Sequence, residues 1–500
     1  MNDLVSVANS VYLALQIMNL FRSLFLSLFL CWGLADLVAQ NCNNNRYRAR
    51  IFEPDMLANI VYGNAQELPL IYISEEITFA SDLTMDVFLP VADELETRPC
   101  VILAYGGAYI FGSKEDEDIQ STCDSLARKG YVAVSINYRM GLNLLDENAS
   151  VRAIYRAAQD FSAAVRYMKA NADEYHIDPE YIFAGGVSAG GFSALHMAYM
   201  EENERPSATF GGGLFNTWPD LGCLDCSGNT LQETHEVRGI INLWGAIMDT
   251  EMMDESELVP QISFHGTEDV LVPYSTGAPF GATLLAPDVS GSNAMHNHIT
   301  GLGGDSELNS FPGVGHNIWG VNVLNVLTPG PTEYWQPITD SIGSWLWRQI
   351  KPEAALISSQ LEALDGIPVS ITVSNAPENG YVCWDIEDGT ILSASSDSSV
   401  VEVLWTGIGI KVARCRNINH LEAASEINEY EFQVSTPTDI DQFQSELAPS
   451  YYYVTDIRGR KVKQVNGSET DNLDLQPGVY ILEWHLPNGL ILKREKRFMQ

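Results

Sequence analysis

Basic residues are scarce in this sequence. Its 500 residues include 28 Lys and Arg against 65 Asp and Glu, which gives a formal net charge of −37 at pH 7. Such an excess of negative charge repels nucleic acid and anionic membranes, and it is typical of a secreted protein with a solvated acidic surface. Past residue 40 the sequence also lacks an apolar run long enough to cross a bilayer. We therefore expect no nucleic-acid partner and no stable membrane span.

Cysteine is also sparse, and its pattern argues against metal or redox chemistry. Of eight cysteines, Cys31 lies in the expected leader, so an odd number remains and at least one stays free or pairs between chains. Cys223 and Cys226 have CxxC spacing, but they lack a second such pair and a thioredoxin-like setting, which favours a local loop disulfide. Cys100, in an apolar strand, and Cys123, in a helix, are expected to be inert core residues. No metal or cofactor is predicted.

The first forty residues have the pattern of a secretory signal peptide. Arg22 precedes an apolar run over residues 24–34, and small residues follow up to Ala39, near which we expect cleavage. Met18 is a better start for such a signal than Met1. A membrane anchor is the alternative, although the run is short for a span. The pattern predicts export.

The chain length predicts two to four domains. Over residues 41–351 strands and helices alternate, which indicates an α/β domain with a largely parallel sheet covered on both faces. The expected strands are an entry hairpin over residues 71–90 and strands over 100–104, 131–137, 240–243 and 261–264. The expected helices cover residues 119–129, 150–171 and 334–350.

A G-x-S-x-G pattern at residues 186–190 is the strongest catalytic signal. Four apolar residues suited to a buried strand precede it, and helix formers follow from Phe192. Strand, pattern and helix together predict a nucleophile elbow with the Ser188 hydroxyl exposed. The alternative, a glycine turn with an incidental serine, is disfavoured by this context.

Glycines after the strand at 100–104 predict an oxyanion hole. Gly106, Gly107 and Ala108 can turn backbone N–H groups into a cavity, and Ala189 supplies a further N–H beside the nucleophile. Tyr109 follows directly and is predicted to contact the substrate. A plain glycine turn is the alternative.

An acid and a base are expected downstream of Ser188, in that order. Asp269 follows the strand at 261–264 and can reach the cleft, with Glu268 as its competitor. His316 lies on a glycine-rich loop after the acid and before the last helix, so we predict it as the base. His265 is too early in the chain for this role.

These motifs together resemble the α/β-hydrolases, in particular the carboxylesterase and feruloyl-esterase-like branch. Residues 47–350 carry the resemblance in YGGAYIFGS, GYVAVSINYR, GVSAGG, HGTEDVLVP and GVGH. Tyr105 stands where most members have His, and Ala108 replaces a third glycine while keeping its N–H. The resemblance implies ester hydrolysis by Ser188, His316 and Asp269 through an acyl-enzyme. A serine peptidase of the same fold, or a binding or adhesion protein with an inactive hydrolase domain, are the alternatives.

Two long loops, over residues 201–237 and 274–307, are expected on the cleft side of such a fold. Phe215 and Trp218 in the first loop are predicted to form a wall of the substrate pocket. The alternative is that they anchor the loop onto the core. The sequence leaves the identity of the ester substrate open: it is either a small molecule or an ester group linked to polysaccharide.

Over residues 352–436 the sequence pattern becomes that of strands, with period-two alternation and without helical segments. This pattern predicts a β-sandwich. Trp384 with Gly389 and Thr390 resembles the core of PKD-like or immunoglobulin-like domains. In such a sandwich Cys383 and Cys415 fall on neighbouring strands, so the resemblance implies a disulfide between them.

Residues 437–500 resemble the C-terminal sorting domain of the type IX secretion system of Bacteroidota. The matching elements are D-x-x-G-R-x-V from Asp456 and L-x-P-G-V-Y-I from Leu475, whereas the usual Y-P-N-P opening is absent. The resemblance implies a small β-sandwich that is handled by the type IX machinery. We therefore expect a secreted or cell-surface serine hydrolase.

Overall fold

The structure is a computed structural model. It describes residue 42, residues 45–437 apart from 70, 71, 73, 144, 145, 213–217, 282–286, 317 and 320–330, and residues 451–456, 460–466, 478–485 and 491–499. The expected signal peptide lies outside these residues. No helix in the described part of the chain is long and apolar enough to cross a membrane.

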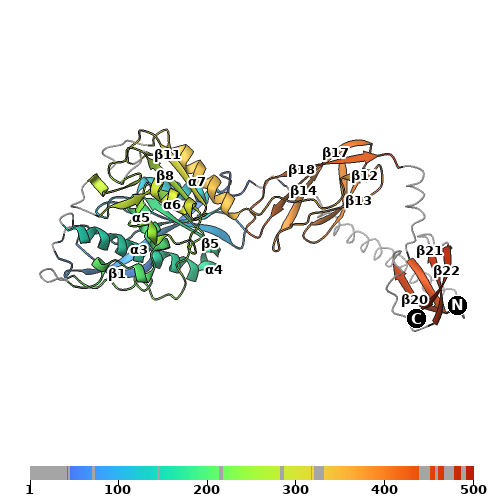
Figure 1. Ribbon diagram of the computed structural model, residues 1–500, viewed down its shortest axis with the longest axis horizontal. Coiled ribbons are helices and arrows are strands. Elements are labelled where there is room, and N and C mark those ends of the chain that lie inside the picture. The colour runs from blue at the N-terminus through green and yellow to red at the C-terminus, as the bar shows by residue number, and fades with distance from the viewer. Residues whose placement is uncertain are drawn as a thin grey trace, which may run out of the picture. The chain divides into compact units, whose positions relative to one another are not determined.

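A sheet with helices packed against it forms the centre of the first compact unit (Figure 1). It has eight strands in the order β1-β2-β4-β3-β5-β6-β8-β11. Its strands are β1 (Pro54–Glu67), β2 (Phe79–Pro90), β3 (Arg98–Ala104), β4 (Val132–Ile136), β5 (Ile177–Val187), β6 (Gly239–Leu243), β8 (Gln261–Gly266) and β11 (Ser306–Phe311). β1 and β2 pair antiparallel, β2 pairs antiparallel with β4, and from β3 to β11 the pairings are parallel. This order confirms the predicted α/β-hydrolase fold.

Helices on the sheet include α2 (Glu117–Ala127), α3 (Glu147–Ala170), α4 (Ala172–Tyr175), α5 (Ala189–Tyr199), α6 (Ser292–Gly301) and α7 (Trp335–Ile350). The connections hold 3-10 turns η2 (Glu202–Glu204), η3 (Ser207–Thr209), η4 (Thr250–Met252) and η5 (Pro279–Gly281), and a small sheet of β7 (Ala246–Ile247), β10 (Val289–Gly291) and β9 (Thr276–Gly277). Alanines on one face let α3 pack tightly, with Ala153, Ala157 and Ala164 all buried.

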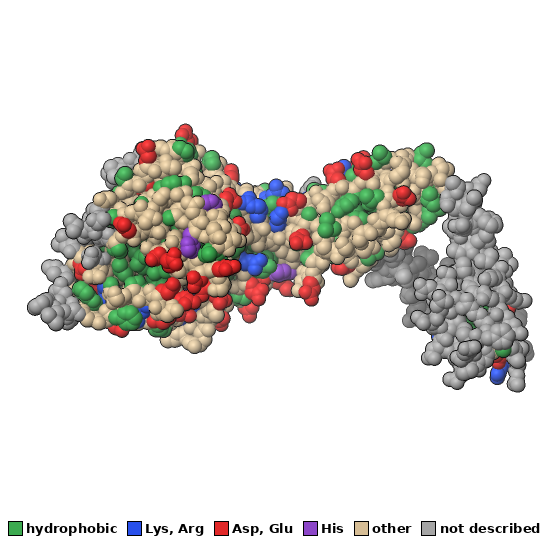
Figure 2. All heavy atoms as spheres, viewed as in Figure 1, with side chains coloured by type: hydrophobic (Ala, Val, Ile, Leu, Met, Phe, Trp, Pro, Cys, Tyr) green, Lys and Arg blue, Asp and Glu red, His purple; other side chains and the backbone are tan. Residues whose placement is uncertain are grey.

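Acidic side chains are spread over the surface seen in Figure 2.

The entry strands differ from the prediction. Residues 74–78 lie outside any strand, and the partner of β2 is the earlier β1. β1 is an edge strand with Met56, Leu57 and Val61 exposed, and its register shifts between Leu57 and Ile60. Because an irregular and exposed edge strand lacks clean alternation, its pattern was not recognisable in the sequence.

The described residues of the second compact unit form strands and no helix, as the sequence predicted. Residues 355–375, 384–415 and 427–500 belong to it. The sheets are β12-β18-β17-β14, β13-β16-β15 and β20-β19-β21-β22. Their strands are β12 (Glu362–Leu364), β13 (Val369–Thr372), β14 (Tyr381–Ile386), β15 (Gly389–Ala394), β16 (Val400–Trp405), β17 (Gly409–Ile418), β18 (Asn428–Ser435), β19 (Tyr451–Asp456), β20 (Lys461–Asn466), β21 (Gly478–His485) and β22 (Ile491–Met499). The start of β14 (residues 381–383) and the end of β17 (residues 416–418) belong to the first unit.

The first unit extends past residue 351, the expected end of the hydrolase domain, because it also contains residues 376–383 and 416–426. Tyr47 donates a hydrogen bond to the backbone oxygen of Leu421 (2.8 Å), and Trp347 Nε1 donates to that of Ala424 (3.1 Å). Leu421 is fully buried in the same hydrophobic core as the sheet. The segment over residues 416–426 is therefore packed into the same hydrophobic core as the central sheet.

One disulfide prediction is wrong. Cys383 bonds to Cys42, with 5.6 Å between their Cα atoms, and Cys415 is a buried free thiol whose pKa burial raises to about 12. The two cysteines that bond are 341 residues apart, and only the folded chain brings them together. The predicted local disulfide between Cys223 and Cys226 is present.

Candidate active site

Ser188 occupies the sharp turn between β5 and α5. Its backbone has φ 52° and ψ −116°, an unfavourable conformation for a residue with a Cβ. A Cβ on Gly186 would lie 2.5 Å from the carbonyl carbon of Gly190, and one on Gly190 would lie 2.2 Å from the backbone oxygen of Ala104. The glycines predicted for the elbow are therefore sterically required, because the strand, turn and helix approach so closely there.

His316 links Ser188 to Asp269. Its Nε2 lies 2.9 Å from Ser188 Oγ, and its Nδ1 lies 2.6 Å from Asp269 Oδ2. A carboxylate only accepts, so Nδ1 carries the proton and Nε2 accepts the hydrogen of the Ser188 hydroxyl. Glu268, the competing acid, is exposed. The structure thus brings together the three residues predicted from the sequence.

The carboxylate of Asp269 is held ionised by its neighbours. Burial of its side chain favours the neutral acid, but hydrogen bonds from His265 and His316 outweigh burial and lower the pKa well below its usual value. The backbone N–H groups of Leu271 and Val272 also donate to Oδ1, at 2.8 and 2.9 Å. Four donors therefore converge on one carboxylate.

His265 is a neighbour of the acid that the sequence did not reveal. Its Nε2 lies 3.1 Å from the backbone oxygen of Val272 and 3.3 Å from Asp269 Oδ2. Both are acceptors, so Nε2 carries a proton. Nδ1 lies 2.7 Å from Ser292 Oγ, which accepts from Asn242 Nδ2 (3.0 Å). In neutral His265, Nδ1 accepts the Ser292 hydrogen, so a buried, directional chain of hydrogen bonds orients the second imidazole toward the acid.

The proposed oxyanion loop has an unusual backbone. Gly107, Ala108 and Tyr109 have φ values of 120°, 53° and 59°. A Cβ on Gly107 would lie 2.2 Å from the backbone oxygen of Phe111, so only glycine fits there. Within the described residues, the N–H groups of Gly107, Ala108 and Ala189 donate to no protein acceptor. These donors are available to a ligand beside Ser188.

Tyrosines hold this loop in place. The rings of Tyr105 and Tyr138 stack with centroids 4.4 Å apart, and the Tyr138 hydroxyl donates to the backbone oxygen of Tyr105 (2.9 Å). The Tyr109 hydroxyl donates to the backbone oxygen of Ala189 (3.0 Å). Tyr109 therefore ties the loop to the start of α5, across the site.

A cavity of about 270 Å³ opens onto Ser188 and His316. Most of its described lining is apolar. Its residues are Gly106, Gly107, Ala108, Tyr109, Phe111, Asp118, Leu142, Ser150, Ile154, Val187, Ser188, Ala189, Phe192, Trp244, Met248, Leu271, Val272, Pro279, Phe280, Pro287, Val289 and His316. All four predicted oxyanion residues and Tyr109 are among them. Such a lining suits a hydrophobic ligand group.

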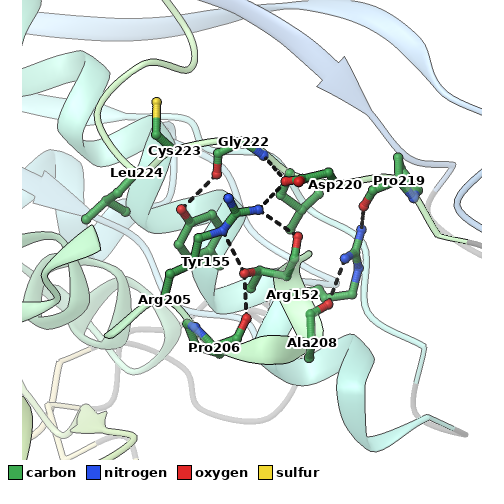
Figure 3. Close-up of polar contacts among 12 residues, drawn as sticks. Arg152, Tyr155, Arg205, Pro206, Ala208, Pro219, Asp220, Gly222, Cys223 and Leu224 are labelled. Carbon is green, nitrogen blue, oxygen red and sulfur yellow. Dashed lines mark hydrogen bonds and ion pairs between the residues drawn. The ribbon is translucent and has the colours of Figure 1, made fainter. Parts of the chain in front are cut away.

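Trp218 is not among the described lining residues, and Phe215 lies outside the described part of the chain. The ring of Trp218 instead lies 6.0 Å from the guanidinium carbon of Arg152. Its loop is anchored on α3, as Figure 3 shows. Arg152 of this helix donates to the backbone oxygens of Ala208 and Pro219, both at 2.8 Å. Tyr155 donates to the backbone oxygen of Gly222 at 2.9 Å. The structure thus favours the anchoring role for Trp218.

No group of three or more His, Cys, Asp or Glu side chains in the described residues is arranged to hold a metal ion. The cavity lining contains one carboxylate, Asp118, besides the polar groups of Ser188, His316, Tyr109 and Ser150.

Residues 85–258 match the protein family described as BD-FAE, a family of α/β-hydrolase esterases. Esterase-5C of Drosophila persimilis is 25% identical over 214 residues, which cover 41% of this chain and 37% of the relative. Esterase LipC of Mycobacterium tuberculosis is 24% identical over 270 residues, 48% of this chain and 58% of the relative. The chain thus spans little more than a third of the length of Esterase-5C.

Among solved structures, Thermogutta terrifontis esterase 2 phosphoramylated by tabun is similar with a TM-score of 0.39 and 18% identity, over 61% of this chain and 97% of that one. The family match includes Gly106, Gly107, Ala108 and Ser188, and it ends before Asp269 and His316. The family and the two curated relatives that the sequence resembles are all esterases.

Proposed function

We propose that this chain is a serine hydrolase that cleaves carboxylic esters through an acyl-enzyme. The observation that carries the proposal is the hydrogen-bonded chain from Ser188 through His316 to Asp269, which ends at a largely apolar cavity. The same cavity presents unpaired N–H donors beside the nucleophile, where a carbonyl oxygen would gain negative charge.

In the proposed mechanism, His316 Nε2 takes the proton of the Ser188 hydroxyl as Oγ attacks the ester carbonyl. The N–H groups of Gly107, Ala108 and Ala189 stabilise the negatively charged oxygen, each by about 3 kcal/mol in the transition state. The imidazolium then protonates the leaving alcohol. Water then attacks the acyl carbonyl while His316 Nε2 takes its proton; the acid leaves, and the imidazolium returns that proton to Ser188 Oγ. Throughout, Asp269 accepts the Nδ1 hydrogen, so that Nε2 is the nitrogen that takes and returns protons.

The lining favours esters with a hydrophobic acyl or alcohol group. In a series of p-nitrophenyl esters, we expect kcat/KM to rise by up to about fourfold per added methylene until the cavity is filled, because each buried methylene contributes about 0.8 kcal/mol. Steady-state rates across the series measure this, with methyl ferulate and acetylated xylan as further candidate substrates.

A p-nitroanilide series with the same acyl groups separates the alternatives. Efficient cleavage of the anilides as well as of the esters would indicate the peptidase, because serine peptidases also cleave activated esters. Failure to hydrolyse any ester, together with no labelling by a fluorophosphonate, would indicate a binding protein with an inactive hydrolase domain.

We also propose that the protein is exported, as the leader pattern and the C-terminal motifs suggest. The bonds between Cys42 and Cys383 and between Cys223 and Cys226 support this, because disulfides persist in oxidising compartments. Deletion of residues 450–500 in the native host is expected to move ester hydrolysis from the culture medium to the periplasm. Undiminished activity in the medium would contradict the role of these residues in type IX sorting.

A further inference from the structure

Asp118 contributes a carboxyl group to the lining of the apolar cavity. It is the second residue of α2, and only 2% of its surface is exposed. The other lining residues are neutral apart from the titratable His316 and Tyr109. A carboxyl group in such a place costs free energy unless it hydrogen-bonds, because burial removes it from water.

Asp118 differs from the other buried carboxylates of the described chain. Four of the five have a basic partner: Glu75 contacts Arg152 and Arg156, Asp86 contacts Lys114, Asp160 contacts Arg139, and Asp269 contacts His316. Asp118 makes no ion pair within the described residues, and its side chain accepts only from backbone N–H groups of its own turn, those of Ile119 (2.8 Å) and of Asp118 itself. Its capacity for hydrogen bonding is therefore largely unused by the protein.

Burial raises the pKa of Asp118 to about 7. Near neutral pH the carboxyl group is thus present in both forms, and the neutral form can donate as well as accept a hydrogen bond. A hydroxyl group suits both forms, because it also donates and accepts. An ammonium group suits only the ionised form, and it would lose its hydration on entering an apolar cavity.

We propose that Asp118 selects ester substrates that carry a hydroxyl group on their hydrophobic portion. This inference rests on the proposed ester hydrolysis and specifies its substrate class: the apolar lining holds the carbon chain, and Asp118 bonds the hydroxyl group. A site with a buried polar group discriminates against an analogue that lacks the matching group, because the group is then left unpaired.

Two pairs of esters test the proposal on the full-length protein. p-Nitrophenyl ω-hydroxyhexanoate and hexanoate place the hydroxyl group on the acyl side, and ω-hydroxyhexyl acetate and hexyl acetate place it on the alcohol side. We expect the wild type to prefer the hydroxylated member of one pair by about tenfold in kcat/KM, chiefly through KM. Asp118→Leu should reverse that preference, because the end of the substrate's carbon chain then contacts an apolar side chain, against which a hydroxyl group stays unpaired.

Asp118→Asn keeps the size of the side chain and should lower the preference without reversing it. Glu117→Gln is the matched control, since Glu117 is exposed on the same turn of α2 and does not line the cavity. Fluorophosphonate labelling of each variant reports an intact Ser188 site. Equal rates within both pairs for the wild type, or an unchanged preference in Asp118→Leu, would overturn the proposal even where the plain esters are hydrolysed. Absence of all hydrolysis and labelling in the wild type would overturn the ester hydrolase itself.

Discussion

Replacing Ser188 with Ala is expected to abolish fluorophosphonate labelling and to lower ester turnover by about 10⁶-fold. In the proposed mechanism Ser188 Oγ is the atom that forms the acyl-enzyme. Removal of a serine nucleophile leaves only the contribution of binding and oxyanion stabilisation. Serine and alanine both carry a Cβ, so the strain of the backbone at φ 52° is the same for both and the thermal stability should change little. Mass spectrometry after labelling, with p-nitrophenyl ester kinetics, provides the measurement.

Ser193→Ala is the matched control for this variant. Ser193 lies in α5, the helix that follows Ser188, is buried, and donates to the backbone oxygen of Ala189 (2.8 Å). It is not among the described lining residues of the cavity. We expect it to retain labelling and most of the turnover. Labelling of Ser188→Ala at the wild-type rate would refute the assignment of the nucleophile.

Asp269→Asn is expected to lower kcat by about 10⁴-fold. An amide in place of the carboxylate can donate to His316 Nδ1, which favours the tautomer with its proton on Nε2, and that tautomer cannot accept the Ser188 hydrogen. The imidazolium formed during attack also loses its anionic partner. Glu268→Gln is the control, because the Glu268 side chain is exposed. The opposite ranking of the two variants would move the role of the acid to Glu268.

The same acid can be probed through its second imidazole. His265→Leu removes a donor to Asp269. We expect kcat/KM to fall by about 10- to 100-fold, which corresponds to the free energy of a hydrogen bond to a charged group. Because that donor helps to lower the pKa of Asp269, its removal leaves a more basic carboxylate, which binds the imidazolium of His316 more strongly. The acid limb of the kcat/KM profile should therefore move to higher pH. His265→Gln, whose amide can reach the position of Nε2, should restore much of the activity and of the profile.

A merely structural role for His265 would lower activity in both variants without moving the pH profile. In that case the loss would follow the fraction of folded enzyme, as measured by fluorophosphonate labelling. The pH profile thus distinguishes positioning of the acid from general packing.

Much of the site was predictable because its signals are local in the chain. The elbow requires glycine on either side of Ser188 within five residues, and the loop at 106–108 requires glycine at a positive φ. Asp269 and His316 follow Ser188 in the order that parallel strands impose on an α/β-hydrolase. The alternation of buried strands and helices likewise predicted the central sheet, since burial on both faces leaves continuous apolar runs.

Other features depend on contacts between residues far apart in the chain, which the pattern around each residue does not report. His265 acts on Asp269 only because α6 places Ser292 against its other nitrogen, and Cys42 meets Cys383 across 341 residues. Asp118 looks like an ordinary acidic residue in the first turn of a helix, a position that favours negative charge at the surface. Packing of α2 beside the oxyanion loop places it in the cavity lining, because burial is a property of the folded chain and not of the helix that carries the residue.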